Sequence, residues 1–261
     1  MIRHFVDTIS QYSYFIVYAA RASLRTEVAN SFLNRLWWIL DPFLNMLVYT
    51  FVFGTIFGIK EENYSVFIFS GLLVWNFFSR TMNSSVKIVR KNKNIISKVY
   101  IPKYVLLIEE MLVNFYKMLF SMLVLFVMML ISNITVTVRI LYMIPIMSEL
   151  FLCTFAFGVV LLHLGVFIDD LSYAIGILLK LLLYLSGVMY HIDTRLDAGL
   201  AFMLKICNPM AMLIEAMHQS LLYGQKPDFM MMGLWAILLA VISVSGIRII
   251  YKYENSYVKV I

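Results

Sequence analysis

The stretch VFIFSGLLVWNFF, Val66 to Phe78, indicates the fold class, because apolar side chains dominate it. The rest of the chain has the same character: 62% of its 261 residues are hydrophobic and 14% are charged. Soluble domains average roughly 45–50% and about 25%. A water-soluble core of this size does not need that excess. The sequence therefore predicts an all-α integral membrane protein.

Six segments approach the roughly 20 apolar residues that a helix needs to cross a hydrocarbon layer about 30 Å thick. The longest stretch outside them, 191–228, holds Asn208-Pro209 followed by the amphipathic LIEAMHQSLL. It predicts short extracytoplasmic helices that re-enter the membrane between the fifth and sixth spans. The predicted spans are Leu36–Phe57, Tyr64–Thr81, Ile108–Ile131, Arg139–Phe167, Tyr173–Tyr190 and Phe229–Tyr251.

Residues 1–35 precede the first span and have a different pattern. Phe5, Ile9, Tyr12 and Ala19 recur at helical spacing with polar residues between them. Such spacing predicts an amphipathic helix that lies in the membrane interface. We therefore divide the chain into an N-terminal interfacial helix, 1–35, and one six-span domain, 36–261.

The distribution of lysine and arginine predicts the orientation. Six spans place both termini on one side, and fourteen basic residues are assigned to that side against five to the other. Cytoplasmic loops of membrane proteins are rich in Lys and Arg. Both termini are therefore expected in the cytoplasm. The net charge of +6 is a topology signal, and we expect no nucleic-acid partner.

The densest basic stretch is VRKNKNIISKVYIPK, Val89 to Lys103, in the loop that follows the second span. Read as a helix from about Asn83, this loop separates a basic face from an apolar face. Two interpretations remain: a helix resting on anionic lipid, or a helix docking into a groove of another protein. The basic face contains Lys87, Lys91 and Lys98, and the apolar face contains Ile88, Ile95 and Val99.

Lys117, Glu149 and Lys180 fall inside predicted spans. Each charge costs on the order of 2.5–3.5 kcal/mol at mid-bilayer, so each is expected to face the protein interior or a wet cavity. Glu149 and Lys180 approach the middle of their spans, so Lys180 is expected to pair with Glu149 or with another carboxylate. Such a pair would either hold two helices together or take part in transport.

Motifs of several enzyme classes are absent from the sequence. No G-x-x-x-x-G-K-[ST] phosphate loop is present, so the chain is not expected to bind ATP in that manner. No H-E-x-x-H or G-x-S-x-G occurs, and the four histidines share no metal-ligand spacing. We therefore expect neither a metal nor a catalytic site.

Five short motifs follow one another along nearly the whole chain. They are SFLNRLWWILDP (31–42), FSGLLVWNFF (69–78), NKNIISKVYIP (92–102), SGVMY (186–190) and NPMAMLIEA (208–216). In this order they resemble the membrane subunits of ATP-binding-cassette exporters of polysaccharides, O-antigens and teichoic acids. Three positions depart from that pattern: Asn34 replaces a glycine, Gly187 replaces a proline, and Asp169-Asp170 stands where the family has Arg-Asp.

The resemblance implies a transport subunit of the bacterial plasma membrane with no enzymatic activity of its own. It pairs with a second copy of itself, and two copies of a separate ATPase subunit, which hold ATP and Mg²⁺, bind beneath. The cargo is a polymer on a polyprenyl diphosphate lipid. Three alternatives stay open: the same architecture exporting a drug-like or lipid cargo, an ion-coupled carrier, and a membrane-embedded lipid-linked sugar enzyme.

The resemblance also assigns roles to residues. It favours docking for residues 83–103, which we call the coupling segment, including Tyr100 and Pro102. Pro102 is expected to end its helix, because the residue before a proline disfavours helical geometry. Cargo is expected to meet basic and aromatic residues at the start of the first span and along the channel, namely Arg35, Trp37, Trp38, Asp41, Trp75 and Tyr190.

Overall fold

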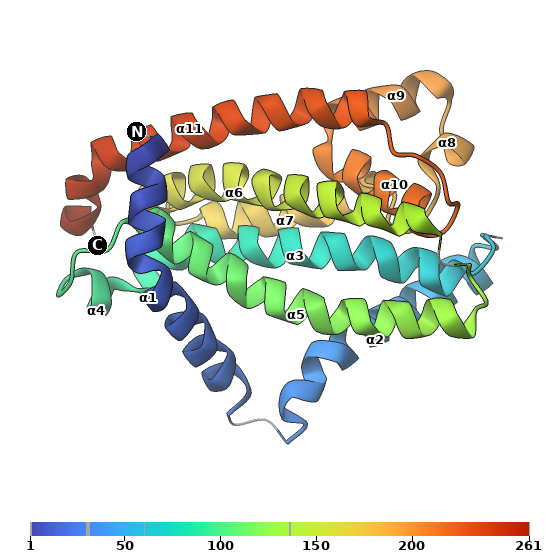
Figure 1. The fold of residues 1–261 in the computed structure, drawn as a ribbon, viewed down its shortest axis with the longest axis horizontal. Coiled ribbons are helices and arrows are strands. Elements are labelled where there is room, and N and C mark those ends of the chain that lie inside the picture. The colour runs from blue at the N-terminus through green and yellow to red at the C-terminus, as the bar shows by residue number, and fades with distance from the viewer. Residues whose placement is uncertain (1, 30–31, 60, 136, 261) are drawn as a thin grey trace.

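The computed structural model describes residues 2–29, 32–59, 61–135 and 137–260, and all secondary structure in these ranges is helical (Figure 1). The prediction of an all-α protein is therefore confirmed. Ser31, the first residue of the first motif, lies outside the described ranges. The α-helices are α1 (Ile2–Val28), α2 (Trp37–Tyr49), α3 (Tyr64–Lys91), α4 (Lys93–Ile96), α5 (Lys103–Ile131), α6 (Met143–Phe167), α7 (Leu171–Leu185), α8 (Ile192–Arg195), α9 (Ala198–Cys207), α10 (Pro209–Leu221) and α11 (Phe229–Val260).

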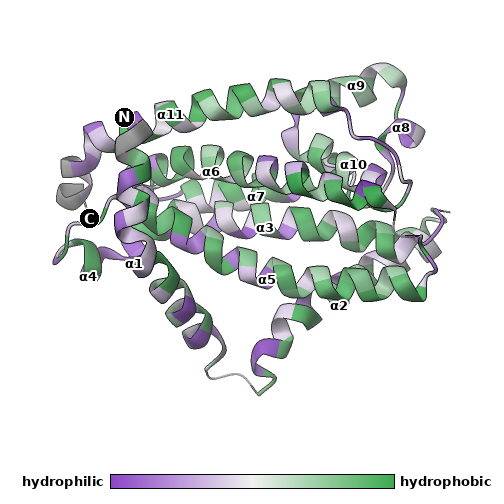
Figure 2. Cartoon of the chain, viewed as in Figure 1, coloured by the Kyte–Doolittle hydropathy of each residue, from purple (hydrophilic) through white to green (hydrophobic). Residues whose placement is uncertain are grey.

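Four helical segments in the described ranges are long and apolar enough to cross a membrane: Asn34–Ile56, Lys103–Ile131, Val138–Phe167 and Phe229–Glu254. The bent pair α9 and α10 gives a fifth if it is counted as one span. Figure 2 shows hydrophobic residues along most of α5, α6 and α11. The chain is an integral membrane protein. Two of the six predicted spans lie outside this set, because α3 carries more polar residues and α7 has only 15 residues.

Helix α3 lies at the centre of the bundle. Most of its residues are buried, and it packs mainly against α5 and α6, with α2, α7 and α10 completing its surroundings. Glycines allow the close approach of α6: a Cβ at Gly165 would lie 2.1 Å from the carbonyl oxygen of Val86, and one at Gly158 would lie 2.9 Å from Leu107 of α5. The contacts of α6 with α3 and α5 therefore depend on small residues in α6.

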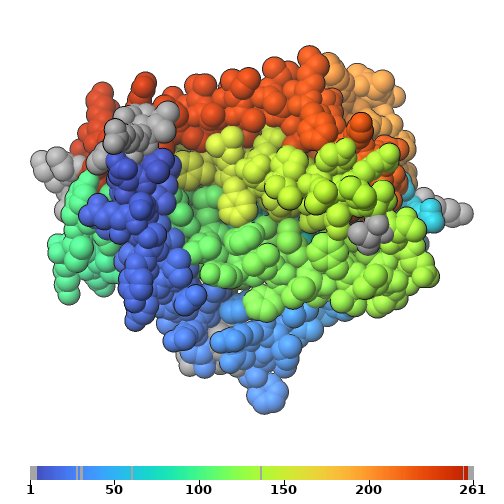
Figure 3. All heavy atoms as spheres, in the orientation of Figure 1, coloured from blue at the N-terminus to red at the C-terminus, as the bar shows by residue number. Residues whose placement is uncertain are grey.

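The helix predicted for residues 1–35 is present as α1, which packs on α5. Figure 3 shows α1 lying across the outside of the bundle rather than inside it. Both ends of the chain lie at the end of the bundle where α4 lies, whereas α8, α9 and α10 lie at the opposite end (Figure 1). The placement of α1 in a membrane interface stays a prediction.

The short helices predicted between the fifth and sixth spans are present as α8, α9 and α10. The chain bends by 108° between α9 and α10. Asn208 caps α10, because its side-chain oxygen accepts hydrogen bonds from the backbone N–H groups of Met210 and Ala211 at 3.0 and 3.4 Å. Pro209 fits the first helical position, where no N–H donor is needed. Re-entry of these helices into the membrane stays a prediction.

Several helices extend beyond the predicted spans. Helix α3 continues to Lys91, past the span end predicted at about Thr81, α5 begins at Lys103, before the span start predicted at about Ile108, and α11 continues to Val260. In each case the helix extends past the apolar run on which the prediction rested. Packing against neighbouring helices stabilises these polar extensions, which hydropathy does not detect.

The contact of Gly165 with α3 generates a prediction. We expect Gly165→Ala to lower the stability of the protein by about 1–3 kcal/mol, because its methyl group would meet backbone atoms that cannot move aside. Gly176→Ala in α7 is the matched control, since no atom lies within 4 Å of its added Cβ. Thermal unfolding in detergent measures both. Equal midpoints for the two variants would contradict the close approach of α3 and α6.

Candidate functional site

A cavity of about 1030 Å³ opens between the C-terminal half of α1, the start of α2, the second half of α3 and the middle of α5. We call it the polar cleft, because charged, amide and hydroxyl groups line most of it. Its walls come from segments that are distant in the sequence. The lining residues are Ser23, Thr26, Glu27, Trp37, Trp38, Asp41, Arg80, Asn83, Ser84, Lys91, Glu110, Val113, Asn114 and Lys117.

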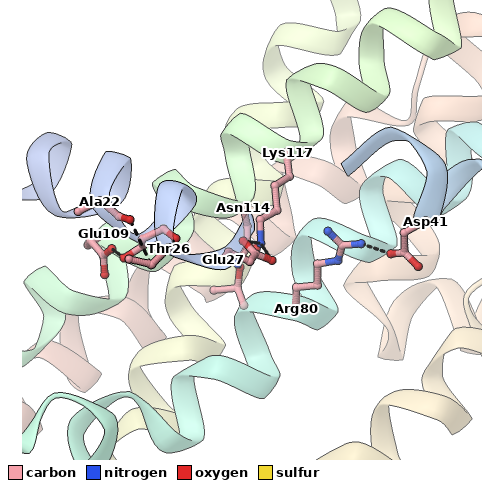
Figure 4. A network of polar contacts seen from close by, with 10 residues as sticks. Ala22, Thr26, Glu27, Asp41, Arg80, Glu109, Asn114 and Lys117 are labelled. Atoms are coloured by element: carbon pink, nitrogen blue, oxygen red, sulfur yellow. Dashed lines mark hydrogen bonds and ion pairs between the residues drawn. The ribbon is translucent and has the colours of Figure 1, made fainter. Parts of the chain in front are cut away.

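Two ion pairs fix the walls of the polar cleft (Figure 4). The Lys117 ammonium in α5 binds both carboxylate oxygens of Glu27 in α1, at 2.7 and 2.6 Å. Arg80 in α3 donates to Asp41 at the start of α2. These contacts join four helices at one level of the bundle. Lys117 therefore faces a polar cavity and has a carboxylate partner, as intramembrane charges usually do.

A second, smaller cavity of about 280 Å³ adjoins the polar cleft, and we call it the arginine pocket. Trp38 lines both cavities, and its ring lies 5.5 Å from that of Phe120. The Trp38 indole N–H is buried and has no hydrogen-bond partner among the described residues. The lining residues of the arginine pocket are Arg21, Leu24, Arg25, Arg35, Trp38, Tyr116 and Phe120.

The two cavities differ in charge. The described residues around the polar cleft include three acidic and three basic side chains, so its charges balance. The described residues around the arginine pocket include three arginines and no acid. Guanidinium groups bind phosphate oxygens through two parallel hydrogen bonds. The arginine pocket thus suits a phosphate group beside an apolar moiety, and the polar cleft suits a neutral chain rich in hydroxyl groups.

The structure brings some of the predicted cargo residues together and separates others. Arg35 and Trp38 line the arginine pocket, and Trp37, Trp38 and Asp41 line the polar cleft. Trp75 is instead a core residue of α3, packed 6.0 Å from Phe78. Tyr190 lies beyond α7, where its hydroxyl donates to a backbone oxygen. These last two residues line neither cavity.

The predicted ion pair between Glu149 and Lys180 is absent from the described part of the chain. Glu149 is buried in α6, and one of its carboxylate oxygens has no hydrogen-bond partner there. Lys180 is exposed on α7. The positions of the two residues along their helices allow a pair at the same depth in the membrane. However, the side of α7 that carries Lys180 faces outward.

The coupling segment is not one amphipathic helix. The end of α3 forms its first part, Asn92 interrupts the helix, α4 adds one turn, and residues 97–102 follow without helix. Ile88 is only 2% exposed and packs inside the bundle, so its assignment to the docking face was wrong. Ile95 and Val99 are 44% and 58% exposed, and Lys87, Lys91 and Lys98 are exposed too.

Pro102 also acts differently from the prediction. The helix before it ends at Ile96, whereas α5 begins directly after Pro102. Pro102 has an extended backbone, with φ −57° and ψ 128°, and its carbonyl oxygen accepts the first bond of α5 from Val105. It therefore starts α5 rather than ending the coupling helix.

Contacts of Arg90 and Tyr100 fasten the coupling segment to the bundle. Arg90 pairs with Asp169 in the turn between α6 and α7 and donates to the Val166 carbonyl at 2.9 Å. Tyr12 of α1 donates to the backbone oxygen of Tyr100 at 3.1 Å. The Tyr100 hydroxyl in turn donates to Glu254 of α11 at 2.9 Å. Burial and this bond raise the pKa of Tyr100 to about 12, so the phenol remains a donor.

At the opposite end of the bundle, possible ligand atoms of His191, Asp193 and Glu215 lie within 4.8 Å of one another. Lys205 pairs with Asp193 at 2.5 Å, and His191 Nε2 lies 3.6 Å from Glu215. The donor set could hold a divalent cation. The ammonium of Lys205 already compensates one of its carboxylates, so the group joins this end of the bundle through one ion pair and the close approach of His191 to Glu215.

Sequence reasoning missed several residues of both cavities. Arg21 and Arg25 are four residues apart in the sequence, which places them on one face of α1. This spacing could have been used to predict a cationic site on that face of α1. Glu27 and Arg80 gave no signal, because their partners Lys117 and Asp41 are distant in the sequence.

These features define a helical membrane protein with a polar cavity at one end and an exposed basic segment beside it. Residues 16–222 match the family described as ABC-2 type transporter, and the chain belongs to this family. The resemblance to ATP-binding-cassette permeases found in the sequence is thus confirmed.

Three O-antigen export permeases are similar in sequence to most of this chain. An O-antigen export system permease protein RfbA of Myxococcus xanthus is 26% identical over 230 residues, which cover 87% of each chain. Two proteins of Klebsiella pneumoniae with the same name are 22% identical over 179 residues (68% of this chain, 69% of the relative) and 20% identical over 247 residues (94% of each).

The structure explains the three departures from the family pattern. Asn34 has a φ of 48°. Glycine adopts this left-handed conformation freely, and asparagine tolerates it better than other residues do. Gly187 has a φ of 70°. Proline cannot adopt that angle, so glycine suits this turn where proline would not. Asp169 is the partner of Arg90.

The ion pair between Glu27 and Lys117 generates a prediction. The Glu27 side chain is 47% exposed and the Lys117 side chain only 11%. Removing Glu27 should therefore destabilise the protein by a different amount than removing Lys117. Glu27→Gln leaves a mostly buried ammonium without its counter-charge, whereas Lys117→Met leaves a carboxylate that water can reach. We expect Glu27→Gln to lower the unfolding midpoint in detergent more than Lys117→Met. The reverse order would contradict the burial of Lys117 in the wall of the cleft.

Proposed function

We propose that the chain is the channel-forming membrane subunit of an ATP-driven exporter of a lipid-linked cell-surface polysaccharide, such as an O-antigen or a teichoic acid. The observation that carries the proposal is the pair of adjoining cavities at Trp38, one cationic and one polar and neutral, in a member of the ABC-2 family. The three relatives named as O-antigen export permeases support the same cargo class.

The proposal includes six spans with cytoplasmic termini in a bacterial plasma membrane. Helix α3 has 28 residues. At a rise of about 1.5 Å per residue it is about 42 Å long, so it can cross although it is less hydrophobic than its neighbours. Its polar residues are tolerated because protein, not lipid, surrounds it. Helix α7 and the turn after it make the fifth span. The excess of basic residues at the α4 end supports a cytoplasmic location for that end.

The two cavities suggest how the cargo is held. A diphosphate bound by Arg21, Arg25 and Arg35 leaves its isoprenoid chain beside Tyr116 and Phe120, facing the membrane. The first sugars then extend past Trp38 into the polar cleft, where hydroxyl groups find donors and acceptors of both signs.

The assembly in this proposal contains two copies of this chain and two copies of a separate ATPase, with ATP and Mg²⁺ on the ATPase. The exposed face of α7, with Lys180, is available to a second copy. The coupling segment offers Ile95 and Val99 to a groove on the ATPase, and Lys98 sets their register. The exposed turn of α4 and the non-helical residues after it thus present apolar anchors beside a charge.

Cargo binding is tested with Arg35→Ala. The arginine pocket is expected to lose one of its three phosphate donors, so polymer at the cell surface should fall about fivefold or more, while glycolipid accumulates inside. Capture of the ATPase should remain unchanged. Arg139→Ala, at the other end of the bundle, is the matched control. Normal surface polymer in the Arg35→Ala strain would show that the arginine pocket does not take up cargo.

Docking is tested with Ile95→Asp, which places a charge on the exposed turn of α4. We expect the variant to insert in the membrane normally but to lose the ATPase in a pull-down, and with it export. Asn94→Asp adds the same charge at the adjacent exposed position without removing an apolar anchor, and it should retain the ATPase. If Ile95→Asp still captures the ATPase and stimulates hydrolysis, the segment rests on lipid rather than on a partner.

A further inference from the structure

A buried ion pair lies where the coupling segment passes into α5. The ammonium of Lys103, the first residue of α5, lies 3.3 Å from one carboxylate oxygen of Glu254 in α11. The two side chains are 2% and 10% exposed. Among the ion pairs of the described residues, this is the most deeply buried, and neither partner belongs to the polar cleft or the arginine pocket.

The second carboxylate oxygen of Glu254 contacts the coupling segment itself. It accepts the hydrogen bond from the Tyr100 hydroxyl at 2.9 Å. Tyr100 is 62% exposed and follows Val99 on the docking side. The Lys103 ammonium also lies 5.5 Å from the centre of the Tyr100 ring. One carboxylate of α11 thus contacts both the exposed part of the coupling segment and the buried start of α5.

Stability alone does not account for this arrangement. Removing two charges from water costs as much as their attraction returns, and apolar pairs of similar size hold helices as well. Because its two oxygens contact Tyr100 and Lys103, the Glu254 carboxylate fixes the position of α11 relative to both the coupling segment and α5. The neighbouring contact between the Tyr104 and Tyr251 hydroxyls, at 2.7 Å, repeats the link one turn away along α11.

Helix α11 connects this point to the far end of the molecule. It is continuous over 32 residues, which corresponds to a length of about 48 Å. It packs along α6, where a Cβ at Gly246 would lie 2.5 Å from Val159, so the two helices are in close contact. Its first residues follow α10 at the end of the bundle opposite α4 (Figure 1). A displacement of its last turns is therefore carried toward α8, α9 and α10.

We propose that Glu254 is a positioning residue that ties movement of the coupling segment to α11, so that closure of the ATPase acts on the far end of the bundle through α11 as well as through α3 and α5. The inference rests on the proposed function, because it needs an ATPase that moves the coupling segment. It adds a route and a residue that lie outside the docking surface.

Two variants test the link in inverted membrane vesicles that contain the chain, its ATPase and the lipid-linked polymer of the host. Glu254→Gln replaces the carboxylate with an amide of the same size, which weakens its contacts with Lys103 and Tyr100 and leaves the exposed docking residues unchanged. Lys103→Met/Glu254→Leu removes both buried charges and keeps apolar contact. Both are expected to capture the ATPase and hydrolyse ATP near the wild-type rate. Polymer moved per ATP should fall about fivefold or more, the lower range of coupling between distant sites.

Folding is checked separately from coupling. The double variant should unfold near the wild-type temperature, because no buried charge is left unpaired. Lys252→Gln, an exposed position on the same helix, is the control and should move a normal amount of polymer per ATP. A double variant that unfolds normally and moves a normal amount of polymer per ATP would overturn the proposal, since Glu254 would then be only a packing residue.

The wild-type arm distinguishes this inference from the proposed function. If the wild-type chain fails to capture an ATPase or to move polymer, the proposed function is wrong. If the wild-type chain does both and the two variants match it, only the role of Glu254 is wrong.

Discussion

The bundle depends on one constraint, the burial of α3 by protein on nearly all sides. Helix α3 contains Asn76, Arg80 and Asn83. Such a helix is poorly suited to lipid, so other helices must cover it. Helices α5 and α6 do so along its length, and the latter approaches closely because Gly165 leaves no side chain in the way. The polar residues of α3 can then form part of an internal cavity. They reach the inner surface of the bundle, where Arg80 and Asn83 line the polar cleft.

The same arrangement gives the two cavities their different character. The polar cleft lies among four helices, and its charges can be paired across the space, as Glu27 with Lys117 and Arg80 with Asp41. The arginine pocket lies toward the outside, between α1 and α5, where no acidic side chain of the described residues reaches. The interior position of the polar cleft brings opposite charges within contact distance. The peripheral position of the arginine pocket leaves its arginines available to a ligand.

The sequence was sufficient for the helical class, the membrane location, the apolar helices α5, α6 and α11, and the family, because each of these depends on local composition or on motifs. The extent of α3 could not be predicted, since tertiary packing stabilises its polar half. The partners of the charged residues could not be predicted either. Lys117 pairs with Glu27, which belongs to a helix predicted to lie in the membrane interface, and Lys180 is exposed. A partner depends on helix rotation, which hydropathy does not encode. Arg35 and Trp38 were predicted from the fit of guanidinium groups to a diphosphate and do line the cavities, while their contact with cargo stays a prediction.

The shortness of α7 has a consequence for the surrounding membrane. The helix has 15 residues, which extend over about 22 Å. The hydrocarbon layer is about 30 Å thick. Side chains of Tyr173, Ile177 and Leu181 are exposed on α7. Where lipid meets them, the bilayer has to thin locally, at a fraction of a kcal/mol for each ångström of mismatch. Covering α7 with another protein surface removes that distortion. In the six-span, two-copy assembly that we propose, hydrophobic mismatch therefore favours contact between the copies, independent of any specific contact between their side chains.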